Sequence, residues 1–153
     1  MQDIAVIEAD KRHSIEVAGL VSRLLIELEP GAEADIKKLE LQALTESLLN
    51  SGKIWAFLAR SNGSNVGVLT LHECAAIYAG GVFGEISELY VAPEVRSLKV
   101  GQQLIEAAME KARALCWKRL EVGTPPENES PRTLRFYKSL GFVATGVRMK
   151  YVL

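Results

Sequence analysis

Two basic residues lie between a predicted strand and a predicted helix, an arrangement typical of an anion-binding site. The segment 85–91 reads EISELYV and is predicted to be a strand, and an amphipathic helix is predicted over 102–116. The first backbone N–H groups of a helix have no internal partners, and the helix dipole adds about half a positive charge there. A phosphate or pyrophosphate satisfies both, and Arg96 and Lys99 would add side-chain cations to the same site.

Two common phosphate-binding loops are missing from the sequence. It contains no G-x-x-x-x-G-K-[ST] segment, which argues against a P-loop nucleotide enzyme. It also contains no G-x-G-x-x-G segment after a strand. The glycines of 80–84 precede a predicted strand, which is the wrong order for a dinucleotide-binding fold.

The segment 91–101 resembles the acetyl-CoA loop of the GNAT N-acetyltransferase superfamily. That loop reads [Q/R]-x-x-G-x-[G/A], after a strand that ends in valine and a nearby proline. Arg96 matches the first position and Gly101 the last. Lys99 stands where the family usually has its first glycine, a residue that tolerates a positive φ angle and close approach of a phosphate. A lysine there would either compensate with its charge or weaken cofactor binding.

A second segment strengthens the resemblance. Residues 134–142 read LRFYKSLGF and are similar to the later family motif F-Y-x-x-x-G-F, which lies on a helix before the last strands. The two motifs occur in the family's order and at its usual separation. The resemblance covers residues 54–150, and the first fifty residues match only in pattern.

The hydrophobic pattern predicts an α/β fold of the α+β type, with a central mixed, mostly antiparallel sheet flanked by helices. This agrees with the acyl-CoA N-acyltransferase fold that the resemblance implies, in a single domain over residues 1–153. A first helix after Ser14 would bury Ile15, Ala18, Val21, Leu25 and Leu28, and a second helix over 33–50 would bury Ile36, Leu39, Leu44 and Leu48. The other predicted elements are strands 3–8, 54–60, 66–73, 82–91 and 119–123, a hairpin turn at 61–64, helices 102–116 and 132–140, and a last strand or hairpin at 142–152.

Composition excludes several classes of protein. The net charge of −1 gives no basic excess for nucleic acid, and no apolar run approaches the 18 residues of a membrane span. The N-terminus lacks a signal-peptide pattern, so we expect a cytoplasmic protein. Cys74 and Cys116 are expected to be buried thiols. His13 and His72 have no partners at ligand or nucleophile spacing, so we expect no metal and no catalytic triad.

The resemblance implies how the cofactor would be held. The pyrophosphate of acetyl-CoA would lie on backbone N–H groups of the loop, and the pantetheine arm would pair with the strand as it leaves its neighbour. The backbone N–H of Leu89 would point at the thioester oxygen and stabilise the developing oxyanion. The cofactor-binding residues expected in this way are Leu89, Tyr90, Val91, Arg96, Ser97, Leu98, Lys99, Val100, Gly101 and Gln102.

Three residues are candidates for proton transfer. Glu85 or Glu88 would act as general base, directly or through water, or both are ordinary strand charges. Side chains alternate along a strand, so without a bulge these two glutamates face opposite ways and at most one reaches the amine. Tyr137 of the second motif would protonate the leaving thiolate, as the resemblance implies, or is a packed aromatic residue.

Further contacts with the cofactor stay open. The family often has an asparagine seven residues before the tyrosine, where this chain has Ser130, and Asn128 is the alternative. Arg132 and Arg135 would reach the 3′-phosphate or are solvated helix charges.

The predicted reaction is acetyl transfer from acetyl-CoA to a primary amine of a small molecule, directly in a ternary complex. The alternatives are a protein or peptide N-acetyltransferase and a non-catalytic acyl-CoA-binding module. An acidic cluster between the first two helices would favour a cationic amine, or is simply solvated. This cluster consists of Glu27, Glu29, Glu33 and Asp35.

The apolar tail 149–153 pairs with a second copy in a homodimer, or is an interior strand.

Overall fold

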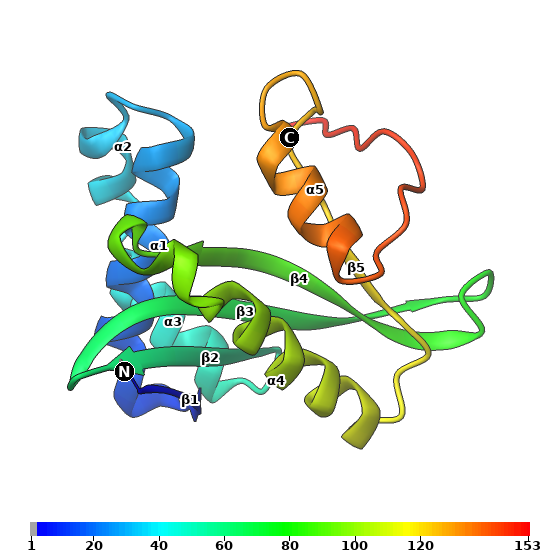
Figure 1. Ribbon diagram of the computed structural model, residues 1–153, viewed down its shortest axis with the longest axis horizontal. Coiled ribbons are helices and arrows are strands. Elements are labelled where there is room, and N and C mark those ends of the chain that lie inside the picture. The colour runs from blue at the N-terminus through cyan, green and yellow to red at the C-terminus, as the bar shows by residue number, and fades with distance from the viewer. Residues whose placement is uncertain (1–2) are drawn as a thin grey trace. The chain divides into compact units, whose positions relative to one another are not determined.

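The computed structural model describes residues 3–153, which form two compact units. The larger unit ends at Glu121 and the smaller unit is Val122–Leu153. Figure 1 shows the elements in chain order. They are β1 (Ile4–Ala9), the 3-10 turn η1 (Lys11–His13), α1 (Ser14–Leu28), α2 (Glu33–Lys38), α3 (Leu41–Asn50), β2 (Ile54–Ser61), β3 (Ser64–Ala76), β4 (Gly81–Val91), the 3-10 turn η2 (Pro93–Leu98), α4 (Val100–Ala114), β5 (Leu120–Val122) and α5 (Pro131–Ser139).

The sheet has the strand order β1-β2-β3-β4-β5, and its first four strands are antiparallel neighbours. The segment that leads into β5 runs parallel to β4 and not antiparallel to it. Lys118 N donates to Val82 O and Gly84 N donates to Arg119 O, so the partners advance together along the two segments. The prediction of a mixed, mostly antiparallel sheet flanked by helices is confirmed.

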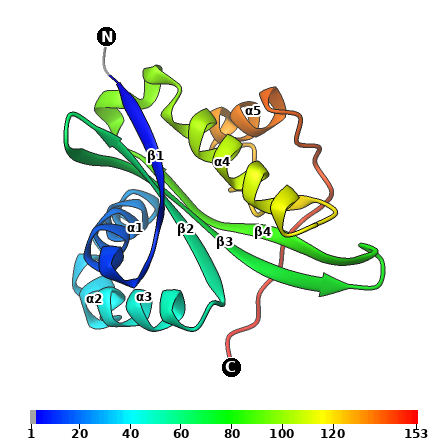
Figure 2. The ribbon, with the colours of Figure 1, turned by 90° about the horizontal axis from the view of Figure 1, so that it is seen from below.

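Helices cover both faces of this sheet. Figure 2 shows α1, α2 and α3 on one side of the strands and α4 on the other. The α4 side is packed so closely that a Cβ atom at Gly67 of β3 would lie 3.1 Å from Leu104 Cδ1 and 3.2 Å from Val100 Cγ1. The opposite side carries Tyr90, whose ring lies under Arg23 of α1. The two faces of β3 and β4 therefore have different neighbours.

The first helix begins where the sequence predicts but buries a different stripe. Asp10 caps the preceding turn by accepting a hydrogen bond from Arg12 N at 2.8 Å, so Ser14 is the first residue of α1 and not its cap. Val17 and Leu20 are buried, whereas Ile15 and Leu28 are 64% and 60% exposed. The predicted stripe was therefore wrong at both ends of the helix.

The predicted second helix is two helices. α2 ends at Lys38, and Glu40 has φ 48° and ψ 51°, in the left-handed region that stops an α-helix. After this break α3 is a separate helix, so the stripe of α2 does not continue along it. Ile36 is buried as predicted, but Leu39 and Leu44 are about half exposed, at 55% and 48%.

The turn between β2 and β3 has the predicted hairpin geometry. Asn62 and Gly63 have φ angles of 49° and 78°. Two consecutive positive φ angles define the type I′ turn, whose twist matches that of the two strands. β3 ends at Ala76 and β4 begins at Gly81, so both strands extend closer to the turn between them than predicted.

The last predicted strand is absent from the described residues. Residues 142–153 form no helix or strand, and the apolar side chains after Phe142 are exposed, with Val147 at 94% and Met149 at 90%. A strand is defined by hydrogen bonds to a neighbouring strand. The segment has no such neighbour among residues 3–153, although its apolar and polar residues alternate as in a strand.

Across the same residues, no helix has the length and apolar character needed to cross a membrane.

Candidate active site

The loop after β4 forms the start of the predicted anion site. Pro93–Leu98 is a 3-10 turn, Lys99 follows with φ 59° and ψ 22°, and α4 begins at Val100, two residues before the predicted start at Gln102. No side chain of residues 3–153 caps this helix N-terminus. Its first backbone N–H groups therefore have no side-chain partner among these residues, which is compatible with the predicted anion site.

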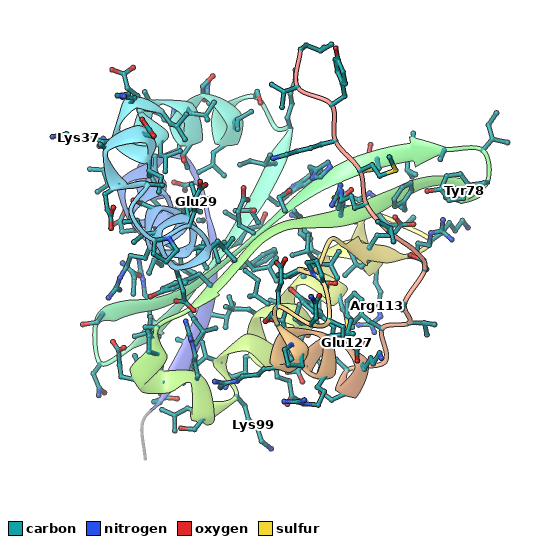
Figure 3. The ribbon with its side chains drawn as sticks, turned by 90° about the horizontal axis from the view of Figure 1, so that it is seen from above. Glu29, Lys37, Tyr78, Lys99, Arg113 and Glu127 are labelled. Carbon is teal, nitrogen blue, oxygen red and sulfur yellow. The ribbon has the colours of Figure 1, made fainter. Side chains whose placement is uncertain are left out.

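Lys99 takes the conformation for which the family usually has glycine. Its φ of 59° lies in the left-handed region, which costs an L-residue about 1–2 kcal/mol. The backbone geometry of the loop is thus achieved without glycine. The Lys99 side chain is exposed and extends away from the sheet (Figure 3).

Replacing Lys99 by glycine is expected to stabilise the fold by about 0.5–1 kcal/mol. Relief of left-handed strain, about 1–2 kcal/mol, exceeds the added entropy of the unfolded chain, about 0.4–1 kcal/mol. Affinity for CoA should fall by no more than about fivefold, since one exposed charge is lost. Urea unfolding and calorimetric titration measure the two effects. Lys99→Ala is the matched control, because it loses the charge but keeps the strain, and a midpoint for Lys99→Gly at or below that of Lys99→Ala would contradict the explanation.

The Arg96 side chain is engaged within the larger unit rather than left as a cation for the cofactor. Its NH2 group donates to both carboxylate oxygens of Glu27 on α1, at 2.7 and 2.6 Å, and its Nε donates to Val91 O at 2.9 Å. The guanidinium also lies 5.9 Å from the centre of the Tyr90 ring. Arg96 thus forms an ion pair that connects the loop to α1, and its role as a second side-chain cation at the phosphate site stays a prediction.

A bulge in β4 places the two candidate bases on one face of the sheet. Glu85 pairs with His72 and Glu88 pairs with Thr70, with a register shift between Thr70 and Leu71 that leaves Ser87 without a cross-strand partner. His72 and Thr70 are two residues apart on β3 and share a face, so Glu85 and Glu88 share it too. The alternation argument, which held only without a bulge, does not separate them.

The two glutamates have different surroundings on that face. Glu88 accepts a hydrogen bond from the Thr70 hydroxyl, and its backbone N donates to the same hydroxyl oxygen at 3.1 Å. Glu85 has a side chain only 14% exposed and lies 3.8 Å from Nε2 of His72. Tyr90 lies further along the same face, beneath Arg23.

Tyr137 lies on α5 in the smaller unit. It is 5% exposed and packs edge-on against Phe136 and Phe142, with ring centres 5.2 and 5.3 Å away. Burial raises the pKa of Tyr137 to about 12. The phenol therefore keeps its proton at any physiological pH.

The remaining predicted cofactor contacts of the smaller unit lie around the start of α5. Ser130 holds the position before the first residue of α5, and its hydroxyl lies 2.6 Å from that of Thr133. Asn128, Arg132 and Arg135 are exposed. These positions are compatible with either a cofactor contact or a solvated helix end.

The acidic cluster beside the first two helices is partly neutralised. Glu27 is paired with Arg96, and Asp35 is paired with Lys38 at 2.9 Å. Glu29, at the end of α1 (Figure 3), and Glu33 are exposed. An acidic surface for a cationic acceptor therefore depends on these two residues.

The sequence reading missed a group of side chains on the same face as the glutamates. His72 and Cys74 of β3 lie beside Glu85, and the ligand atoms of the three are all within 4.8 Å of one another. The signal was present as two residues spaced i, i+2 on a predicted strand. Their partner comes from the next strand, so spacing alone could not reveal it. The expectation of buried thiols is also corrected, since Cys74 is half-buried and Cys116, with φ 58° in the turn after α4, is exposed.

Comparison with known proteins identifies the family. The model of the Acetyltransferase (GNAT) family matches residues 21–142. An aminoalkylphosphonate N-acetyltransferase from Salmonella typhimurium is 33% identical over 96 residues, which are 63% of this chain and 61% of that protein. The chain thus matches about three fifths of this relative's length.

Solved structures share the fold at low sequence identity. A ribosomal-protein-alanine N-acetyltransferase from Brucella melitensis biovar Abortus matches with a TM-score of 0.73 and 22% identity, over 99% of this chain and 98% of that one. An aminoglycoside N-acetyltransferase in complex with CoA matches with a TM-score of 0.76 and 22% identity, over 100% and 96% of the two chains. With its loop, its bulged strand and its sheet, and with the family model matched over most of its length, the chain belongs to the Acetyltransferase (GNAT) family.

Proposed function

We propose that this chain is an acetyl-CoA-dependent N-acetyltransferase that acts on a primary amine of a small molecule. The observation that carries the proposal is the uncapped N-terminus of α4 after the left-handed turn at Lys99, in a chain of this family. A pyrophosphate there would accept hydrogen bonds from the backbone N–H groups of 96–102. The pantetheine arm would extend beside 89–91, with the Leu89 N–H directed at the thioester oxygen.

The reaction forms an N–C bond and breaks a C–S bond without a covalent enzyme intermediate. The amine nitrogen attacks the thioester carbonyl carbon and its proton passes to Glu85 or Glu88, directly or through water. The CoA thiolate leaves and takes a proton from Tyr137. The motif around Tyr137 and its retained proton support the last assignment. The shared face of the two glutamates supports either of them as base.

A small-molecule acceptor is favoured over a protein. The relative with 33% identity acts on an aminoalkylphosphonate, and several structural relatives are aminoglycoside acetyltransferases. A ribosomal-protein-alanine acetyltransferase among the structural relatives keeps a protein N-terminus as the second candidate. Glu29 and Glu33 would attract a cationic amine.

The setting of the reaction belongs to the same proposal. Residues 1–153 would work as one acetyltransferase domain in the cytoplasm. The exposed apolar side chains of 149–153 would pair with a second copy of the chain in a homodimer.

The test has two stages. Calorimetric titration with acetyl-CoA and with CoA should give one site with micromolar affinity, and thiol release should then be measured with aminoalkylphosphonates, aminoglycosides and a peptide with N-terminal alanine. Turnover with one of the first two classes is the expected result. Binding without turnover on any amine would leave the acyl-CoA-binding module, and no binding would refute the proposed site.

Two-substrate kinetics separate the proposed direct transfer from a covalent route. Cys74 lies beside His72 and Glu85, the kind of neighbours that activate a thiol nucleophile. Direct transfer predicts intersecting double-reciprocal lines when both substrates are varied. Parallel lines, lost in Cys74→Ser, would instead indicate an acetyl-cysteine intermediate.

A further inference from the structure

Three side chains of residue types that can bind metals lie close together on one face of the β3–β4 hairpin. His72 and Cys74 are two residues apart on β3 and share a face, and Glu85 is the cross-strand partner of His72. Nε2 of His72 lies 3.8 Å from Oε2 of Glu85, and Sγ of Cys74 lies 3.9 Å from the same oxygen. One ligand atom of each residue lies within 4.8 Å of the other two.

We propose that His72, Cys74 and Glu85 bind one Zn²⁺ ion. Imidazole, thiolate and carboxylate together are a zinc ligand set, whereas Mg²⁺ and Ca²⁺ prefer oxygen ligands throughout. Three protein ligands leave the fourth tetrahedral position to water. The sequence predicted no metal site, because neither histidine had a partner at ligand spacing.

The distances fit a zinc centre after small movements. Bonds of about 2.0 Å to nitrogen and oxygen and about 2.3 Å to sulfur give tetrahedral edges of about 3.3–3.5 Å between ligand atoms. The pairs that involve Glu85 thus need to close by about 0.5 Å, and the His72–Cys74 pair, which lies within 4.8 Å, by up to about 1.3 Å. The His72 side chain is 36% exposed, so its neighbours do not fully enclose it.

A fourth residue orients the histidine. Nδ1 of His72 lies 2.7 Å from Oγ of Ser87, the bulge residue of β4. With the Nδ1 proton donated to this hydroxyl, the lone pair of Nε2 is directed to the side on which Glu85 lies. Metal-bound histidines commonly hold their second nitrogen in this way, which fixes the tautomer and the ring orientation.

Solvent reaches the histidine from the edge of the sheet. A surface pocket beside His72 is lined also by Trp55 of β2, Glu73 of β3 and 52–54 before β2. The pocket reaches His72 and is lined by neither Cys74 nor Glu85, so it gives access to the histidine alone. All these residues belong to the larger unit, and the site is inferred from their side-chain geometry. A Glu85 bound to zinc would leave Glu88 as the candidate base of the proposed acetyl transfer.

The test titrates tag-free, chelator-treated protein with Zn²⁺ by calorimetry and with Co²⁺ by absorption spectroscopy. We expect one ion per chain and a thiolate-to-cobalt charge-transfer band. Cys74→Ser should remove this band and weaken Zn²⁺ binding by more than about 100-fold, since a ligand should contribute more than the 10–100-fold typical of an outer-shell partner. Ser87→Ala should weaken binding by about 10–100-fold with the band retained.

Cys116→Ser is the matched control, because Cys116 is the other cysteine and lies in the exposed turn after α4. It should bind Zn²⁺ and Co²⁺ like the original chain. The site is refuted if wild-type protein binds Zn²⁺ no more tightly than Cys74→Ser, or if the cobalt band disappears in Cys116→Ser and persists in Cys74→Ser. Circular dichroism confirms that each variant is folded.

Discussion

Replacing Gly101 by glutamate is expected to weaken CoA binding at least about 100-fold while the fold stays intact. Gly101 lies in the first turn of α4, where the pyrophosphate is proposed to bind. A carboxylate about 4 Å from one phosphate charge costs about 4 kcal/mol at an effective dielectric of 20, a factor of roughly 1,000. Movement of the exposed side chain reduces that figure. Calorimetric titration with CoA measures the loss.

The same substitution should not destabilise the protein, which separates loss of binding from loss of structure. A negative charge in the first turn of a helix is favourable, and removing a helical glycine adds about 0.5–1 kcal/mol. Gly19→Glu is the matched control, since Gly19 lies on the exposed face of α1 with open space around it. It should bind CoA normally. Retained affinity in Gly101→Glu would place the pyrophosphate elsewhere.

Replacing Tyr137 by phenylalanine is expected to lower kcat about 100-fold with little change in acetyl-CoA affinity. Proton donation by a positioned side chain contributes about 10²–10⁴-fold to such reactions. The pKa of Tyr137, raised to about 12 by burial, lies well above that of a thiol near 8.5, so the pKa difference opposes donation of the phenol proton to the thiolate. The lower end of the range is therefore expected. Single-turnover and steady-state thiol release measure the effect.

Two observations control this result. Tyr78→Phe makes the same change at the tip of the β3–β4 hairpin (Figure 3), where the side chain is 76% exposed, and should leave kcat unaltered. Equal kcat in Tyr137→Phe and the original chain would remove the phenol from the mechanism. The pKa of Tyr137 also predicts that any change of kcat between about pH 6 and 9 persists in Tyr137→Phe, because the phenol does not titrate there.

The raised pKa has a consequence for stability at alkaline pH. An unfolded tyrosine loses its proton near pH 10, and folded Tyr137 does so near 12. The folded state therefore holds this proton more tightly, and the resulting stabilisation is complete below pH 10. It is lost as pH rises from 10 to 12.

The order of strand, short loop and helix around Lys99 was predictable because its signals are local. A strand, a short connection and a helix with an open N-terminus follow from residues adjacent in the sequence, and Lys99 stands at the turn that the family fills with glycine. The engagement of Arg96 was not predictable in this way. Its partner Glu27 lies 69 residues away, and nothing in the loop itself indicates an acidic partner on α1.

Helix boundaries and buried stripes failed where tertiary contacts override the local pattern. Leu39 and Leu44 fit one continuous helical stripe, but the left-handed Glu40 between them turns the chain and starts a new helix. The tail 142–153 alternates like a strand without a ladder partner among residues 3–153. In both cases the apolar residues recur with the expected period, but no neighbouring element among residues 3–153 buries these side chains as the pattern predicted.

The bulge at Ser87 makes the facing of Glu88 relative to Glu85 a matter of chain length rather than of side-chain identity. Strand side chains alternate with a period of two, and the bulge takes up one residue of β4 that has no partner on β3. Deleting Ser87 would therefore remove the bulge and leave Glu88 opposite Thr70, on the face of Glu85 as before. One residue inserted after Glu88 without a second bulge would instead turn Tyr90 toward α4, a reversal that no single substitution can produce.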